Sequence, residues 1–167
     1  MLNTGTLKVA TSGDRAIVMT REFEAPAVLV FDAFSNPALL PRWFGPRGWS
    51  LAICEVDLRV GGAWRFVLRG PDGAEMGMRG TYQEIERPLR SVHTEIFDDF
   101  ADAGESVVTA VFAEEGGKTT MTAIVEYGSR EVRDAVLASG MEHGAAESYD
   151  KLAELLASMT TTASVGA

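Results

Sequence analysis

Hydrophobic and polar residues alternate with a period of two along most of the chain, the pattern of strands that bury one face. In residues 16–23, Ile17, Met19 and Arg21 fall on one side of the chain. In residues 63–69, Trp64 and Phe66 do the same. The pattern predicts strands at 16–23, 51–58, 63–69, 75–86, 90–97, 106–113 and 119–127.

Two other parts of the chain have helical spacing. Between the first two strands, residues 27–34 and 37–42 predict two short helices. The first follows Pro26 and the second begins at Pro37, and proline is suited to the first helical turn. After the last strand, Ser129 is a suitable N-cap for one long helix that runs to about residue 158. A helix of roughly 30 residues has a length of about 45 Å.

Two glycines, Gly140 and Gly144, lie in the middle of this predicted helix. Each costs about 1 kcal/mol of helix stability relative to alanine. We expect that cost to be offset by a close approach of the helix to the sheet, or to a molecule bound there.

This order of elements predicts a single α+β domain over residues 15–159. A curved antiparallel sheet of six to seven strands is expected to wrap around the long C-terminal helix. One helix seldom fills such a concave face, so the pattern also predicts a pocket. Residues 1–14 are expected to be a flexible lead-in and residues 160–167 a disordered tail, because both are rich in small and polar residues.

Composition narrows the possible partners. The 167 residues suit one domain with a full core, and the net charge of −9 disfavours nucleic acid, which needs clustered Lys and Arg. Cys54 is the only cysteine, so it is interpreted as a small buried hydrophobe, and a thiolate metal site is not expected. No apolar run suits a secretory signal or a membrane span, so a cytoplasmic protein is predicted.

A set of large side chains falls on the faces assigned inward, or in the loop after the second short helix. Methionine adapts to varied apolar shapes, and buried Trp and Tyr each bring one polar atom that needs a partner. Core packing explains such a set as readily as a ligand does, but we favour a site for a small hydrophobic or amphipathic molecule, without cofactor or metal. The candidate binding residues are Trp43, Phe44, Trp64, Phe66, Met76, Met78, Tyr82, Met121 and Met141.

Catalysis is the alternative, and its candidates are His93, Glu95 and Tyr82. Alternation places His93 and Glu95 on one face of their strand, with Val92 and Thr94 on the other. The more apolar face is expected to point inward, which leaves His93 and Glu95 in solvent. In the opposite register they form a buried acid/base pair, which a cyclase, dehydratase or hydrolase could use. Binding is therefore favoured over catalysis.

Several short segments also carry a resemblance to a known family. They are Arg21–Pro26, Val30–Phe34, Arg42–Pro46, Asp57–Phe66, Pro71–Gly73, Gly80–Tyr82, His93–Glu95 and Gly140–Gly144. In this order and spacing they resemble the activator of Hsp90 ATPase family, within the helix-grip superfamily of Bet v 1, START and polyketide-cyclase-like proteins.

The resemblance covers roughly residues 16–159 and implies a curved sheet that grips the C-terminal helix around a cavity. Bacterial members of this kind are single domains, whereas the co-chaperone behind the family name has an additional N-terminal domain for which this chain is too short. An interaction with Hsp90 is therefore only a weakly supported expectation, and a homodimer is a further one.

Overall fold

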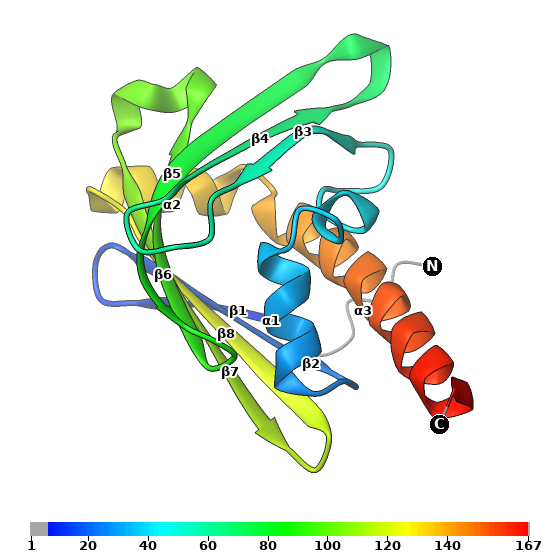
Figure 1. Ribbon diagram of the computed structural model, residues 1–167. Helices are drawn as coiled ribbons and strands as arrows, with labels where there is room; N and C mark the ends of the chain where they lie inside the picture. The colour runs from blue at the N-terminus through cyan, green and yellow to red at the C-terminus, as the bar shows by residue number, and fades with distance from the viewer. Residues whose placement is uncertain (1–6, 167) are drawn as a thin grey trace.

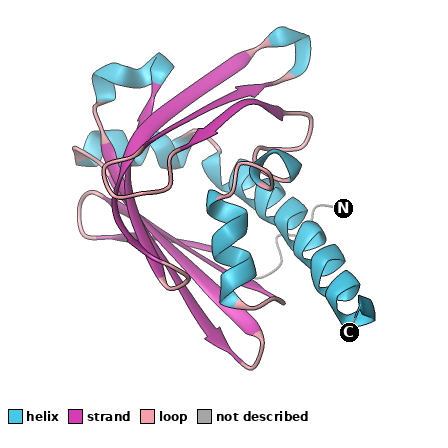
Figure 2. Cartoon of the chain, viewed as in Figure 1, coloured by secondary structure: helices cyan, strands magenta, loops and turns pink. Residues whose placement is uncertain are grey.

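A computed structural model describes residues 7–166, which form one curved antiparallel sheet covered by helices on its concave side (Figures 1 and 2). The strand order is β1-β2-β8-β7-β6-β5-β4-β3, and every neighbouring pair is antiparallel. The strands are β1 (Lys8–Ser12), β2 (Ala16–Phe23), β3 (Ser50–Val56), β4 (Ala63–Arg69), β5 (Glu75–Glu86), β6 (Arg90–Phe97), β7 (Ser106–Glu115) and β8 (Lys118–Glu126).

Two helices supply most of the cover. Helix α1 (Ala27–Ser35) follows β2, and α3 (Met141–Gly166) ends the chain beside it, as Figure 1 shows. Short 3-10 helices are η1 (Leu40–Arg42), η2 (Pro71–Gly73) and η3 (Asp98–Ala103), and α2 (Arg130–Ala138) precedes α3. The predicted α+β architecture, with a long C-terminal helix held by a curved sheet, is confirmed.

The sheet has eight strands rather than the predicted six to seven. Residues 8–12 lie in the expected flexible lead-in but form β1, which pairs with β2 from Lys8 opposite Thr20 to Ser12 opposite Ala16. Val9 is its only partly buried residue. Because backbone hydrogen bonds rather than apolar burial hold this edge strand, the hydrophobic pattern gave no sign of it. Residues 1–6 of the lead-in lie outside the described part of the chain.

The single long helix predicted from Ser129 is in fact two helices. Ser129 caps α2 as expected, since its Oγ accepts a hydrogen bond from the Val132 amide at 3.2 Å. The chain then breaks at Gly140, whose φ of +85° is the left-handed conformation that commonly ends helices. The expectation that Gly140 lets the helix approach the sheet is therefore wrong. Helix α3 also continues through residues 160–166, where a disordered tail was expected.

The other glycine, Gly144, does mark a close contact, but with a loop rather than with the sheet. A Cβ at this position would lie 3.4 Å from Cγ of Pro46. The second short helix is likewise smaller than predicted, because only Leu40–Arg42 of residues 37–42 is helical, as the 3-10 helix η1.

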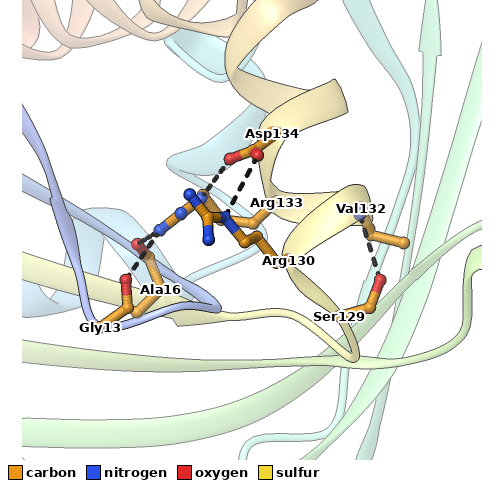
Figure 3. A network of polar contacts seen from close by, with 7 residues as sticks. All are labelled: Gly13, Ala16, Ser129, Arg130, Val132, Arg133 and Asp134. Carbon is orange, nitrogen blue, oxygen red and sulfur yellow. Dashed lines mark hydrogen bonds and ion pairs between the residues drawn. The ribbon is translucent and has the colours of Figure 1, made fainter.

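Arg133 joins α2 to the turn between β1 and β2. Its guanidinium donates hydrogen bonds to the backbone carbonyls of Gly13 and Ala16 at 3.3 and 3.1 Å, and it pairs with Asp134 at 2.8 Å (Figure 3). Asp134 also lies 3.8 Å from Arg130 on the preceding turn (Figure 3). These contacts satisfy a charge that is otherwise buried and fix α2 against the end of the sheet.

A buried ion pair joins α3 to β2. Nη1 of Arg21 lies 3.0 Å from Oδ1 of Asp150, and the side chains are only 5% and 7% exposed. The guanidinium also lies over the ring of Phe23, 5.4 Å from its centroid. Nε of Arg21 and Oδ2 of Asp150 have no partner among the described residues. Removal of either charge would leave the other unpaired in the core, so this pair constrains the position of α3 against β2.

We expect Asp150→Leu to lower the free energy of unfolding by about 3–5 kcal/mol, because it leaves the Arg21 charge buried without a counter-ion. The double variant Arg21→Met with Asp150→Leu is expected to recover most of that loss. Urea denaturation measures each effect. The control is Arg15→Met in the exposed Arg15–Glu126 pair, where a loss of about 0.2–1 kcal/mol is expected. A single Asp150→Leu variant as stable as this control would contradict the role of the pair.

Candidate functional site

A cavity of about 90 Å³ lies between α1 and the concave face of strands β4–β7. Helix α1, η1 and the following loop form one wall, and inward side chains of the sheet form the other. The lining residues are Phe31, Phe34, Ser35, Leu40, Phe44, Leu58, Trp64, Phe66, Met78, Tyr82, Ser91, His93, Glu95, Ala110 and Phe112. Most of this surface is aromatic or aliphatic, which is typical of small-molecule sites.

Trp43 packs behind α1, on the side away from the cavity interior, and stabilises this helical wall. Its side chain is only 1% exposed, its Nε1 donates a hydrogen bond to the Ala33 carbonyl at 2.9 Å, and its ring packs against Phe34. The next residue, Phe44, turns toward the sheet and meets Phe66 with ring centroids 5.1 Å apart. Trp43 is thus an anchor in the core, and Phe44 is the part of this loop that reaches the cavity.

Trp64 forms the floor because of a glycine on the neighbouring strand. Gly80 is the cross-strand partner of Trp64, and a Cβ there would lie 1.8 Å from the Thr94 carbonyl oxygen and 2.6 Å from Nε1 of Trp64. Without that atom, the indole reaches over β5 and donates a hydrogen bond to the Thr94 carbonyl at 3.2 Å. The indole is thereby fixed with its polar atom satisfied, beside His93 on β6.

His93 and Glu95 face this cavity, which corrects the expectation that they lie in solvent. Tyr82 pairs with His93, but beyond a β-bulge Glu84 pairs with Val92. A regular hairpin counted from the turn would pair Tyr82 with Thr94 and place the Tyr82 side chain on the face opposite to that of His93. Since one extra residue reverses which side chains face inward, the bulge brings His93 and Glu95 onto the same face as Tyr82.

Alternation of polar and apolar residues misled the prediction because both faces of β6 are covered. Val92 and Thr94 are 4% and 2% exposed, although they point away from the cavity. Thr94 is satisfied there, since its Oγ1 accepts a hydrogen bond from the Thr81 amide at 2.9 Å. The relative hydrophobicity of the two faces of β6 therefore does not tell which one points inward, and the bulge on β5 sets which β5 side chains share that face.

Besides Ser35, whose Oγ donates a hydrogen bond to the Phe31 carbonyl at 3.0 Å, four polar side chains line the cavity, those of Tyr82, Ser91, His93 and Glu95. His93 packs edge-on against Trp64 and Tyr82, with ring centroids 5.5 and 6.0 Å apart. Within residues 7–166, these four side chains form no hydrogen bond or ion pair with another protein group. Polar groups that face an apolar hollow without partners are the usual contacts of a ligand.

Burial shifts the proton affinities of these groups in opposite directions. It lowers the pKa of His93 from 6.5 to about 4, because the imidazolium would lose its hydration. For the same reason it raises the pKa of Glu95 from 4.5 to about 7. Burial, and then the nearby Cys54, raise the pKa of Tyr82 to about 12. At pH 6 the imidazole is thus uncharged and most of the Glu95 carboxyl is protonated, a pairing often found at functional sites.

Five of the nine candidate binding residues line the cavity: Phe44, Trp64, Phe66, Met78 and Tyr82. The remaining four do not. Trp43 and Met121 are fully buried in the core, whereas Met76 and Met141 pack at its margin. The cavity lies under α1 rather than under the long helix, which is why Met141 of α3 is not part of it.

Sequence reasoning missed several lining residues. Those on α1 and η1 are Phe31, Phe34, Ser35 and Leu40, and the helical spacing of the phenylalanines was the available signal. Ala110 and Phe112 alternate inward on β7, but a small and a large apolar residue carry no distinct mark of a ligand site.

An eight-stranded antiparallel sheet curved around a C-terminal helix, with a cavity inside, defines the helix-grip class of α+β domains. The family described as "Activator of Hsp90 ATPase homolog 1-like protein" matches residues 24–157, and the chain belongs to this family. No curated protein matches the chain.

Solved structures from bacteria share the fold. A protein from Rhodobacter sphaeroides is 33% identical, with 90% of this chain and 98% of that chain covered and a TM-score of 0.84. Protein Ms6760 from Mycobacterium smegmatis is 26% identical, with 89% and 95% covered and a TM-score of 0.80. An AHSA1 protein from Silicibacter pomeroyi is also 26% identical, with 85% and 97% covered and a TM-score of 0.70.

No helix within residues 7–166 is long and apolar enough to cross a membrane. The acidic segment Asp98–Ala103 forms η3, where Asp98 pairs with Arg65 at 2.7 Å and also with Arg79. The Asp98 carboxylate therefore serves to hold η3 against β4 and β5.

Glu95 and His93 give the stability of the domain opposite pH dependences. The pKa of Glu95 is raised in the folded state, so its contribution to stability falls as the pH rises from about 4.5 to about 7. The pKa of His93 is lowered, so its contribution falls as the pH drops from about 6.5 to about 4. In the overlap of these windows the two slopes oppose each other.

Glu95→Gln removes the first contribution. We expect the variant to gain stability relative to the unmodified chain as the pH rises from 4.5 to 7, by up to about 1.4 kcal/mol per pH unit. Urea denaturation at intervals across this window measures the difference, and Glu86→Gln on the exposed side of β5 is the matched control. A stability difference that stays constant with pH would contradict the burial of the Glu95 carboxyl.

Proposed function

We propose that this protein binds a small ring-containing molecule in the cavity under α1. The observation that carries the proposal is the set of unpartnered polar side chains, Ser91, His93 and Glu95, facing an otherwise apolar hollow. These side chains are half-buried, and polar groups that lie in an apolar hollow without a protein partner cost free energy, which a ligand with complementary polar atoms offsets. Trp64 and the phenylalanines supply flat apolar surface for its ring.

The size of the cavity favours a compact ligand. About 90 Å³ is well below the roughly 300–1,000 Å³ of sites for drug-sized molecules, so a single ring with a short substituent suits it better than a sterol or a long lipid. This narrows the broader expectation of a hydrophobic or amphipathic ligand.

Access is favoured beside the loop between β3 and β4. Leu58 lines the cavity yet is 41% exposed, so the cavity approaches solvent at this point. Two backbone hydrogen bonds hold the loop against β5, from Gly61 to the Tyr82 carbonyl at 2.8 Å and from Tyr82 to the Gly62 carbonyl at 2.9 Å. Breaking these two bonds would let Leu58 move aside.

Catalysis on the bound molecule is a second candidate, supported by the convergence of Tyr82, His93 and Glu95 in one cavity. A neutral imidazole can accept a proton while a protonated carboxyl donates one, which is the arrangement that proton transfer at a carbon beside a carbonyl requires. A His93→Gln variant that binds a substrate but no longer converts it would favour this candidate. Equal conversion by the variant would exclude this role for His93.

Filling the cavity is the direct test of binding. Ala110 is a lining residue that is 7% exposed, and Ala110→Leu is expected to occupy the hollow and weaken binding of phenol, indole and benzyl alcohol at least tenfold. Titrations followed by Trp fluorescence and by amide chemical shifts measure the affinities. Ala113→Leu, on the exposed side of the same strand, is the control and is expected to bind normally. No binding of any ring compound to the unmodified protein would contradict the proposed function.

A further inference from the structure

The cavity contains one acid and no base that is charged at neutral pH. Among its lining residues, Glu95 is the only carboxylic acid, and neither Lys nor Arg is present. His93 lies on the same strand face, but burial keeps its imidazole uncharged because its pKa falls to about 4. When the carboxyl of Glu95 ionises, its negative charge therefore has no counter-ion within the cavity.

Three arginines of the strands and turns around α1 and the sheet are paired with other carboxylates. Arg21 is bound to Asp150 at 3.0 Å, and Arg65 to Asp98 at 2.7 Å. Arg87 pairs with Asp32 at 2.7 Å on the outside of α1. Glu95 is therefore the lining residue whose negative charge is not neutralised by a described protein group.

The titratable groups that face Glu95 from the surrounding elements are also uncharged at neutral pH. They are His93 on its own strand, Tyr82 on β5, Tyr127 after β8 and Tyr149 on α3. Burial, and then the charge of Glu95, raise the pKa of both Tyr127 and Tyr149. None of these groups supplies the positive charge that an ionised Glu95 needs.

The walls of the cavity suit a cation. Six aromatic rings besides Tyr82 and His93 line it, those of Phe31, Phe34, Phe44, Trp64, Phe66 and Phe112. The negative face of an aromatic ring attracts an ammonium group, and this attraction grows when water is excluded. An unpaired carboxyl among aromatic rings is thus complementary to an amine attached to a small apolar group.

We propose that the natural ligand is an organic cation, a compact ring that carries a protonated amine, with the Glu95 carboxylate as its counter-ion. This inference rests on the proposed function and specifies the chemical class of the ligand. The amine brings the charge that the cavity lacks, and its ring occupies the aromatic surface. Binding then stabilises the ionised form of Glu95, so it releases a proton from the protein at pH values below 7.

Three ligands with the same ring separate this proposal from its alternatives: benzylamine, benzyl alcohol and phenylacetate. We expect benzylamine to bind at least tenfold more tightly than benzyl alcohol at pH 8, and phenylacetate to bind most weakly. Between pH 5 and 7, the Kd of benzylamine is expected to fall by up to tenfold per pH unit, because Glu95 must ionise. The Kd of benzyl alcohol is not expected to fall with rising pH. Calorimetric titrations measure all three.

The Glu95→Gln variant tests the residue itself. We expect it to lose the preference for benzylamine and its pH dependence, but to keep binding benzyl alcohol, which also shows that the cavity is still formed. Glu86→Gln is the control and is expected to retain the preference. Equal binding of benzylamine and benzyl alcohol at pH 8, or a preference that survives Glu95→Gln, would overturn the inference and leave the proposed function standing. Failure of all three ligands to bind would overturn both.

Discussion

The β-bulge between Tyr82 and Glu84 decides what the cavity contains. The extra residue, Gln83, lies on β5 and reverses the alternation of that strand, so Tyr82 faces inward although Glu84 and Glu86, nearer the turn, are exposed. Strand β6 alternates regularly, so Ser91, His93 and Glu95 all face the cavity, and Tyr82 joins them from β5. A regular ladder at the same place would pair Tyr82 with Thr94 and separate the Tyr82 side chain from those of His93 and Glu95.

Most buried polar groups elsewhere in the described chain have protein partners. The Trp43 and Trp64 indoles each donate to a backbone carbonyl, and the guanidinium of Arg21 meets the carboxylate of Asp150, although Nε of Arg21 and Oδ2 of Asp150 have no partner among the described residues. The half-buried side chains of His93 and Glu95 form no hydrogen bond or ion pair with another group of residues 7–166. Natural sequences depart from local consistency mainly at functional sites, so this departure supports a ligand there.

The period of two along the chain was sufficient to predict seven strands, the α+β class and the inward faces of β4 and β5. It also identified Trp64 and Tyr82 as lining residues. It could not identify β1, whose stability comes from backbone pairing with β2, or the helix break at Gly140, which depends on a left-handed backbone conformation. The inward face of β6 escaped prediction because Val92 and Thr94 on its other face are also buried, so hydrophobicity does not distinguish the two faces.

The proposed binding site depends on Glu95, a carboxyl without a counter-ion inside an aromatic cavity. It is tested most directly by an NMR titration of the Glu95 side-chain carboxyl carbon in protein labelled at glutamate, with Glu95→Gln used to assign the signal. We expect a midpoint at about pH 7 in the free protein, because loss of hydration disfavours the charged form. A midpoint near 4.5 would show instead that the Glu95 carboxyl is solvated or already paired.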